Sequence, residues 1–204
     1  MNNILLPEVD HHFGWSRLYH GIITLIQFVL TLTRCWAWLK GHLVFQTRLV
    51  SRQLSFNALV IPILEYACPV WNTYLGKHTK TIEKIQRRAS RLIWGSDKEY
   101  PERLLELKWE SSELRRKYLS LVQMYKIIFG YCDINCHHYF DIIGITRTRS
   151  KHEYKIRPKV TRANYFKYSF FYRYINDWNS LPSNVMSSPS LQSFKVSLIK
   201  YFRS

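Results

Sequence analysis

Glycine is scarce in this chain, and its spacing excludes several nucleotide-binding and catalytic motifs. The 204 residues contain seven glycines, and no two of them lie closer than seven positions apart. A phosphate-binding loop needs two glycines five positions apart, and a dinucleotide-binding fingerprint or a nucleophile elbow needs them closer still. The sequence therefore carries no signature of a nucleotide-binding loop or of a serine hydrolase.

Acidic residues are also few, and none stands next to another. The chain has 14 Asp and Glu residues, so a metal site built from one short paired-carboxylate motif is absent. A zinc-protease helix is absent too, because Ile156 occupies the position where a second histidine would follow His152 and Glu153. We expect no metal, no cofactor and no small-molecule substrate, and we predict that the chain is not an enzyme.

Cysteine is sparse, which separates this chain from disulfide-rich secreted proteins. There are four cysteines, Cys35, Cys68, Cys132 and Cys136. This density predicts a reducing, intracellular compartment, nuclear or cytoplasmic. Cys132 and Cys136 precede His137 and His138, and all four side chains could ligate zinc. Adjacent histidines rarely reach one ion, however, and no second ligand pair appears before His152, so an ordinary loop is the favoured interpretation.

Positive charge, by contrast, is abundant. Lys and Arg number 30 against 14 acidic residues, which gives a formal net charge of +16. Such an excess predicts acidic partners, either nucleic acid or an anionic membrane surface. Hydrophobic residues make up 47% of the chain and aromatic residues 16%, so the chain can bury enough apolar surface to fold.

Residues 1–48 differ in character from the rest and are expected to form a separate apolar segment. The stretch from Gly21 to Leu39 is apolar except for Arg34 and a few polar positions, and it comes near the roughly 20 residues that a spanning helix needs. A secretory signal peptide is not expected, because Glu8 and Asp10 occupy the region where basic residues should lie. A buried apolar helix is favoured, and membrane contact through Gly21 to Leu39 is the alternative.

The remainder, residues 49–204, reads as a series of helices. The expected helices are Leu49 to Tyr66, interrupted by Pro62; Thr79 to Trp94, ended by Gly95; Pro101 to Leu107; a helix capped by Ser111 and ended by Gly130; Asn164 to Ser180; and a last helix capped by Ser190. A further short helical turn is expected near Tyr139 to Ile143. No run alternates as a strand does, so the predicted class is mainly α, a small domain of about five to seven helices with a basic, partly extended segment near residues 145–163.

The helix from Thr79 to Trp94 carries the first candidate binding site. Its basic residues recur at helical spacing opposite an apolar stripe, and they are Lys80, Lys84, Arg87, Arg88 and Arg91. Phosphate recognition requires such a one-sided array, because each neutralised phosphate releases a counterion. A solvated helix face is the alternative interpretation.

A second candidate site lies in the basic, partly extended segment and the helix after it. Its central cations are Lys155, Arg157, Lys159 and Arg162. Aromatic residues are interleaved with them, including Tyr154, Tyr165, Phe166, Tyr168, Phe170, Phe171 and Tyr172. Such rings can stack on bases while cations follow the backbone. The alternative is that the rings belong to the core and only the cations are exposed.

Four short blocks in a fixed order resemble one protein family. The first runs from Leu54 to Trp71 and contains Leu-Val-Ile-Pro-Ile-Leu-Glu-Tyr-Ala, and the second is Ile82-Glu-Lys-Ile-Gln-Arg-Arg-Ala89. The third extends from Leu114-Arg-Arg116 to Tyr125-Lys126, and the fourth joins Trp178-Asn-Ser-Leu-Pro182 to Pro189-Ser190 and Phe194-Lys195. Together they resemble the region downstream of the catalytic core in non-LTR (LINE-like) retrotransposon reverse transcriptases, over about three-quarters of the chain.

The resemblance implies a thumb-like, helical part of such an enzyme that follows the polymerase palm and helps to grip the template-primer duplex. The family's polymerase requires an adjacent aspartate pair to hold two magnesium ions. None of the five aspartates here has an acidic neighbour, and residues 1–48 do not match the family. We therefore expect a truncated, catalytically inactive portion with residual, non-specific RNA or DNA binding. A small membrane-anchored basic protein is the alternative.

Overall fold

The computed structural model describes residues 49–72, 76–143, 154–159 and 169–203. The chain divides into two compact units, Met1–Ser55 and Phe56–Ser204, and each is considered by itself. In the first unit the structure describes helix α2, Leu49–Ser55. The apolar stretch from Gly21 to Leu39 lies outside the described residues. All elements discussed below belong to the second unit.

The second unit begins with a helical segment that changes pitch. The π-helical turn η1 (Phe56–Val60) leads directly into α3 (Ile61–Glu65), and Pro62 stands in the first turn of α3. A proline is tolerated in the first turn because its missing N–H has no intrahelical partner to lose. The interruption expected at Pro62 is therefore present: a π-helical turn comes first, and the α-helix begins again at Ile61. After Tyr66 the chain forms another short helix, α4 (Cys68–Trp71), which it enters through Ala67 at φ 49°.

The helix with the candidate basic site, α5, spans Gly76–Trp94 and begins three residues before the expected Thr79. Its end is as predicted: Gly95 has φ +110°, and its N–H bonds to the carbonyl of Arg91 at 2.9 Å. The next helix, α6 (Tyr100–Glu106), follows after a short loop. Glu102 accepts a hydrogen bond from the backbone N–H of Glu99 at 3.3 Å and so completes the first turn of α6.

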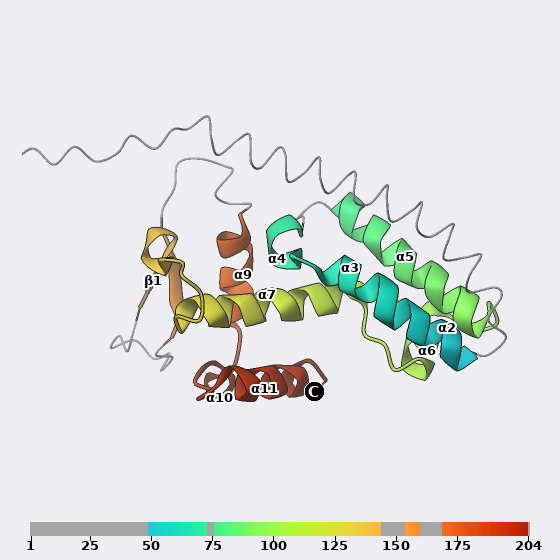
Figure 1. The fold of residues 1–204 in the computed structure, drawn as a ribbon. Helices are drawn as coiled ribbons and strands as arrows, with labels where there is room; N and C mark the ends of the chain where they lie inside the picture. Colours follow the sequence, from blue (N-terminus) through green and yellow to red (C-terminus); the bar gives the residue numbers. More distant parts are fainter. Residues whose placement is uncertain (1–48, 73–75, 144–153, 160–168, 204) are drawn as a thin grey trace, which may run out of the picture. The chain divides into compact units, whose positions relative to one another are not determined.

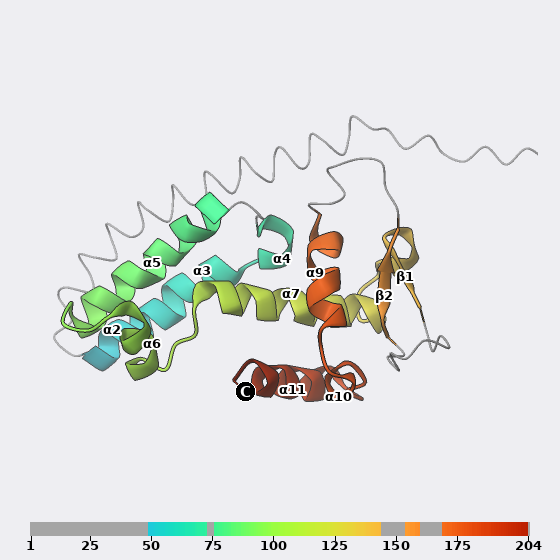
Figure 2. The same cartoon turned by 180° about the vertical axis from the view of Figure 1, so that it is seen from behind.

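Helix α7 (Ser112–Ile128) is the central element of the second unit. Ser111 caps it as predicted, accepting the N–H of Leu114 at 3.2 Å. Helices α4, α5, α9 and α11 all pack on it; α9 crosses α7, and α11 runs alongside it (Figures 1 and 2). Burial is therefore wider than the single heptad-like seam that the sequence predicts for this helix, which consists of Leu114, Tyr118, Leu121, Tyr125 and Ile128. It also includes Arg116, Ser120, Val122, Met124 and Ile127.

The segment after α7 contains a small sheet where a helical turn was expected. The 3₁₀ turn η2 (Cys136–His138) precedes strand β1 (Phe140–Ile142), which pairs antiparallel with β2 (Ile156–Pro158). The prediction of a helical turn near Tyr139 to Ile143 is thus wrong. The reason is tertiary: β1 pairs with residues distant in sequence and buries Phe140 completely. Strand β2 confirms the extended character of the described part of the basic segment.

The last three helices complete the fold. They are α9 (Phe170–Asn179), the short α10 (Ser183–Met186), which was not predicted, and α11 (Leu191–Arg203). Ser190 caps α11 as expected, accepting the N–H of Ser193 at 3.1 Å. Tyr125, Trp178 and Phe194 meet in the core between α7, α9 and α11, with Tyr125 and Phe194 stacked at 4.4 Å. The mainly α class is confirmed.

Candidate nucleic-acid interface

One side of helix α5 is buried in the second unit, and hydrogen bonds fix the orientation of the helix about its axis. Ile82, Ile85, Ala89 and Ile93 are buried on that side. Two buried polar side chains fix the rotation of the helix. The Gln86 amide donates to the carbonyl of Glu110 at 2.7 Å, and the Ser90 hydroxyl accepts from Arg103 Nε at 3.2 Å. The opposite side of α5 is therefore held in solvent.

That opposite side carries the five predicted cations, which we call the α5 basic row: Lys80, Lys84, Arg87, Arg88 and Arg91. All five are exposed. At 3.6 residues per turn they occupy an arc of about 100° centred opposite the buried side. None of the five forms an ion pair with any residue that the structure describes.

Elsewhere in the described residues, several cations already have acidic partners. The pairs are Lys98–Glu106 at 2.6 Å, Lys117–Asp177 at 2.7 Å, Arg203–Glu110 at 3.2 Å, and Arg115–Glu65. These acids lie on other elements and neutralise local charge there. The α5 basic row is thus a surface where positive charge is gathered without compensation, which is the electrostatic pattern of a phosphate-binding face.

Tyr100 of α6 contacts residues at one edge of the α5 basic row. The Arg87 guanidinium lies 4.7 Å from the centroid of the Tyr100 ring. The Tyr100 hydroxyl donates to Glu83 Oε1 at 2.5 Å, and burial together with this bond raises the pKa of Tyr100. Glu83 is the single acidic residue of α5, and this bond holds its carboxylate at Tyr100. No sequence signal links these two residues, which lie 17 positions apart.

The second predicted cluster is less available for binding. Lys155, Arg157 and Lys159 lie on or beside β2, whereas Arg162 lies outside the described residues. Lys159 pairs with Asp141 of β1 at 3.7 Å and also donates to the carbonyl of His137. Asp141 is the register partner of Arg157 as well. Strand pairing therefore brings an acid beside these cations, which the linear sequence did not indicate.

The aromatic residues of that cluster serve the core where the structure describes them. Phe171 stacks on Tyr139 with centroids 4.0 Å apart, and Tyr154 packs against Phe129 at 4.7 Å. Tyr165, Phe166 and Tyr168 lie outside the described residues. Phe171 and Tyr154 therefore pack against other rings of the protein, and a role for these two rings in stacking on bases is not supported.

The cysteine and histidine residues after α7 do not converge. The Cys132 thiol accepts a hydrogen bond from Gln123 at 3.4 Å, Cys136 is buried, and His137 and His138 are exposed. Within the ranges that the structure describes, no three His, Cys, Asp or Glu side chains are placed to share a metal ion. A structural role explains each thiol.

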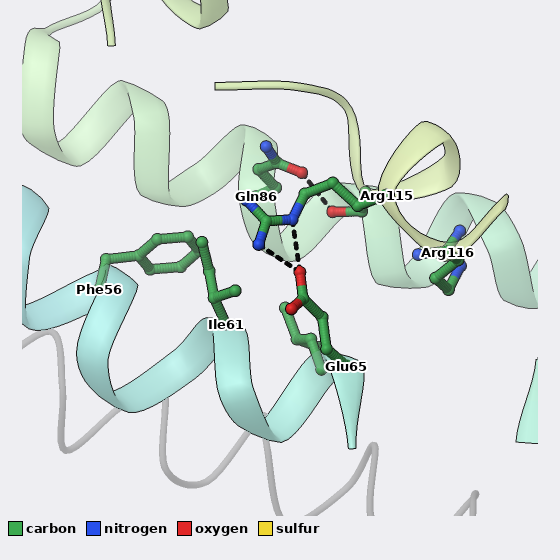
Figure 3. Close-up of a pocket in the computed structure, with 8 residues that line it drawn as sticks. Phe56, Ile61, Glu65, Gln86, Arg115 and Arg116 are labelled. Carbon is green, nitrogen blue, oxygen red and sulfur yellow. Dashed lines mark hydrogen bonds and ion pairs between the residues drawn. The ribbon is translucent and has the colours of Figure 1, made fainter. Parts of the chain in front are cut away.

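Arg116 is a buried residue to which the sequence analysis assigned no role. Figure 3 shows Arg115 reaching Glu65 while the neighbouring Arg116 is turned away from that pair. Arg116 is only 2% exposed, and its Nε and Nη2 have no hydrogen-bond partner among the described residues. Burial lowers its pKa, and the nearby Glu83 partly offsets that shift. The signal that could have found it is the polar repeat Ser112, Arg116, Ser120, one residue per turn on α7.

Comparisons with known proteins found no relative of this chain. No family model, no curated protein and no solved structure matches this chain. Among the helices of residues 49–72, 76–143 and 169–203, none is long and apolar enough to span a bilayer. Membrane contact through Gly21 to Leu39 stays a prediction, because that stretch lies outside the described residues.

Proposed function

We propose that this chain is the helical portion that follows the polymerase core in a non-LTR retrotransposon reverse transcriptase, inactive alone and able to bind RNA or DNA without sequence preference. The observation that carries the binding function is the α5 basic row, exposed and unpaired with any described acid. Phosphate contacts through such a row supply affinity but read no bases.

Contacts between the four resembling blocks support the family part of the proposal. Glu65 of the first block pairs with Arg115 of the third (Figure 3). Tyr125 of the third block stacks on Phe194 of the fourth, 4.4 Å between centroids. Helix α5, which carries the second block, packs on α7, which carries the third. The four blocks therefore contact one another within the second unit.

The fourth block also has a clear structural purpose. The side-chain amide of Asn179 accepts the N–H of Ile156 at 3.0 Å and donates to the carbonyl of the same residue at 2.8 Å. This mimics a neighbouring strand along β2. The Trp178 indole N–H adds a bond to the carbonyl of Tyr154 at 2.9 Å. The Trp-Asn pair thus fastens the extended segment to α9.

The salt dependence of binding tests the function. The variant Lys84→Gln, Arg88→Gln, Arg91→Gln spares Arg87, which contacts Tyr100, and keeps helix propensity. We expect the slope of log affinity against log salt to fall by roughly 2 to 3, because about three phosphate contacts are lost. Fluorescence anisotropy with a labelled oligonucleotide at several salt concentrations gives the slope.

A matched control removes the same charge from other surfaces. In Arg115→Gln, Lys117→Gln, Arg203→Gln each substituted residue comes from an ion pair outside the row. The slope of this control should stay near that of the unmodified protein. Equal slopes in the row variant, the control and the unmodified protein reject α5 as the interface.

Polymerase activity provides a second test. Purified protein incubated with magnesium on a primed RNA template is expected to give no extension, because the chain contains no adjacent pair of aspartates. Extension products are resolved on a denaturing gel. Primer extension that copurifies with the folded protein contradicts the proposal.

A further inference from the structure

We infer that the α5 basic row ends in a base-stacking position at Trp94, so that the interface takes single-stranded nucleic acid. The inference rests on the proposed function and specifies its substrate class. It follows from where Trp94 lies on the helix, from what covers its ring, and from what a duplex can offer to an aromatic side chain.

Trp94 continues the line of cations along α5. Lys80, Lys84, Arg87, Arg91 and Trp94 follow one another at intervals of four, three, four and three residues. This spacing keeps them on one stripe of the helix. Trp94 is the last residue of α5, about 4.5 Å along the axis beyond Arg91. A strand whose phosphates follow the cations therefore arrives at this ring.

The position at the helix end suits a base better than a phosphate. The last carbonyl groups of a helix carry partial negative charge, which disfavours an anion there. A neutral base stacked on an indole meets no such penalty. The row thus has cations where phosphates are favoured and an aromatic ring where they are not.

The Trp94 side chain at the end of the row is half-buried. Among the residues that the structure describes, the Lys98 ammonium lies over the ring, 5.2 Å from its centroid, and Lys98 is itself paired with Glu106 in an exposed position. The indole N–H bonds to no residue that the structure describes. An exposed cation–π contact and an exposed ion pair are each weaker than base–aromatic stacking, so an arriving base displaces Lys98.

The ring of Tyr100 also lies beside the row, but its face and its hydroxyl already contact other side chains. The guanidinium groups of Arg87 and Arg103 lie 4.7 and 5.9 Å from its centroid, and its hydroxyl is bonded to Glu83. Trp94 is therefore the ring at the row that a base can reach. Bases inside a duplex are stacked on one another, and only an unpaired base presents its face to a side chain.

The experiment compares strands that differ only in their bases. Anisotropy is measured with a single-stranded oligothymidylate and with the same strand carrying abasic sites, whose phosphates are unchanged. We expect the unmodified protein to bind the normal strand about 5- to 150-fold tighter. Trp94→Leu should abolish this preference without changing the salt slope, and Trp94→Phe should retain part of it. Tyr131→Leu, which removes an exposed ring from the loop after α7, should behave as the unmodified protein.

Each outcome separates this inference from the proposed function. An unmodified protein that binds normal and abasic strands equally overturns the stacking position without any variant. A folded Trp94→Leu protein that keeps the full preference for bases also overturns it, and in both cases the row variant still shows its reduced slope. A row variant with an unchanged slope rejects the proposed function itself.

Discussion

Replacing Trp178 by alanine is expected to destabilise the second unit by about 3 to 5 kcal/mol, the cost typical of removing a buried tryptophan. Trp178 is fully buried, packs against Phe194 with centroids 5.8 Å apart, and bonds the carbonyl of Tyr154. Alanine leaves a cavity at the junction of α7, α9 and α11 and also leaves that carbonyl without its donor. Urea unfolding followed by far-UV circular dichroism measures the loss.

Leu105→Ala is the matched control for this prediction, because the side chain of Leu105 on α6 is 78% exposed. Its effect should stay within about 0.5 kcal/mol. Trp178→Phe keeps most of the ring but loses the indole N–H, so its free energy of unfolding should fall between the two. If Trp178→Ala is no less stable than Leu105→Ala, the core at α9 is wrongly placed.

Replacing Arg116 by methionine is expected to stabilise the protein by about 1 to 3 kcal/mol, which is the cost typical of leaving a buried polar group without a hydrogen bond. Arg116 is buried between α7 and its neighbours, and two of its nitrogens bond to no residue in the part of the chain that the structure describes. Burying two unbonded nitrogens of a charged group costs free energy that methionine does not. The urea midpoint should rise.

The adjacent Arg115→Met provides a control of opposite sign. Arg115 is paired with Glu65, and both side chains are partly exposed, so losing the pair should cost about 1 kcal/mol or less. If Arg116→Met instead destabilises the protein more than Arg115→Met does, then the attraction between Arg116 and the nearby Glu83 outweighs the burial cost. That result would falsify the prediction.

Local rules determined much of the helical framework. The ends of α5, α7 and α11 follow from residues that act on their own neighbours: Gly95 adopts a left-handed φ, and the hydroxyls of Ser111 and Ser190 accept the first free N–H groups. The apolar stripe of α5 decides which side is buried, because its period matches the helix. The exposure of the α5 basic row could thus be predicted from the sequence by itself.

Tertiary structure decided the features that depend on residues far apart along the chain. Residues Phe140 to Ile142 form a strand because residues 156–158 pair with them, and the amide of Asn179 in turn holds Ile156 of that partner strand; no local pattern encodes either contact. Lys159 meets Asp141 for the same reason. Arg116 is buried because helices surround α7 on several sides, whereas a single heptad seam predicts one buried face. Sequence periodicity reports which side of an element is apolar, but the number of sides that are covered depends on how many elements pack there.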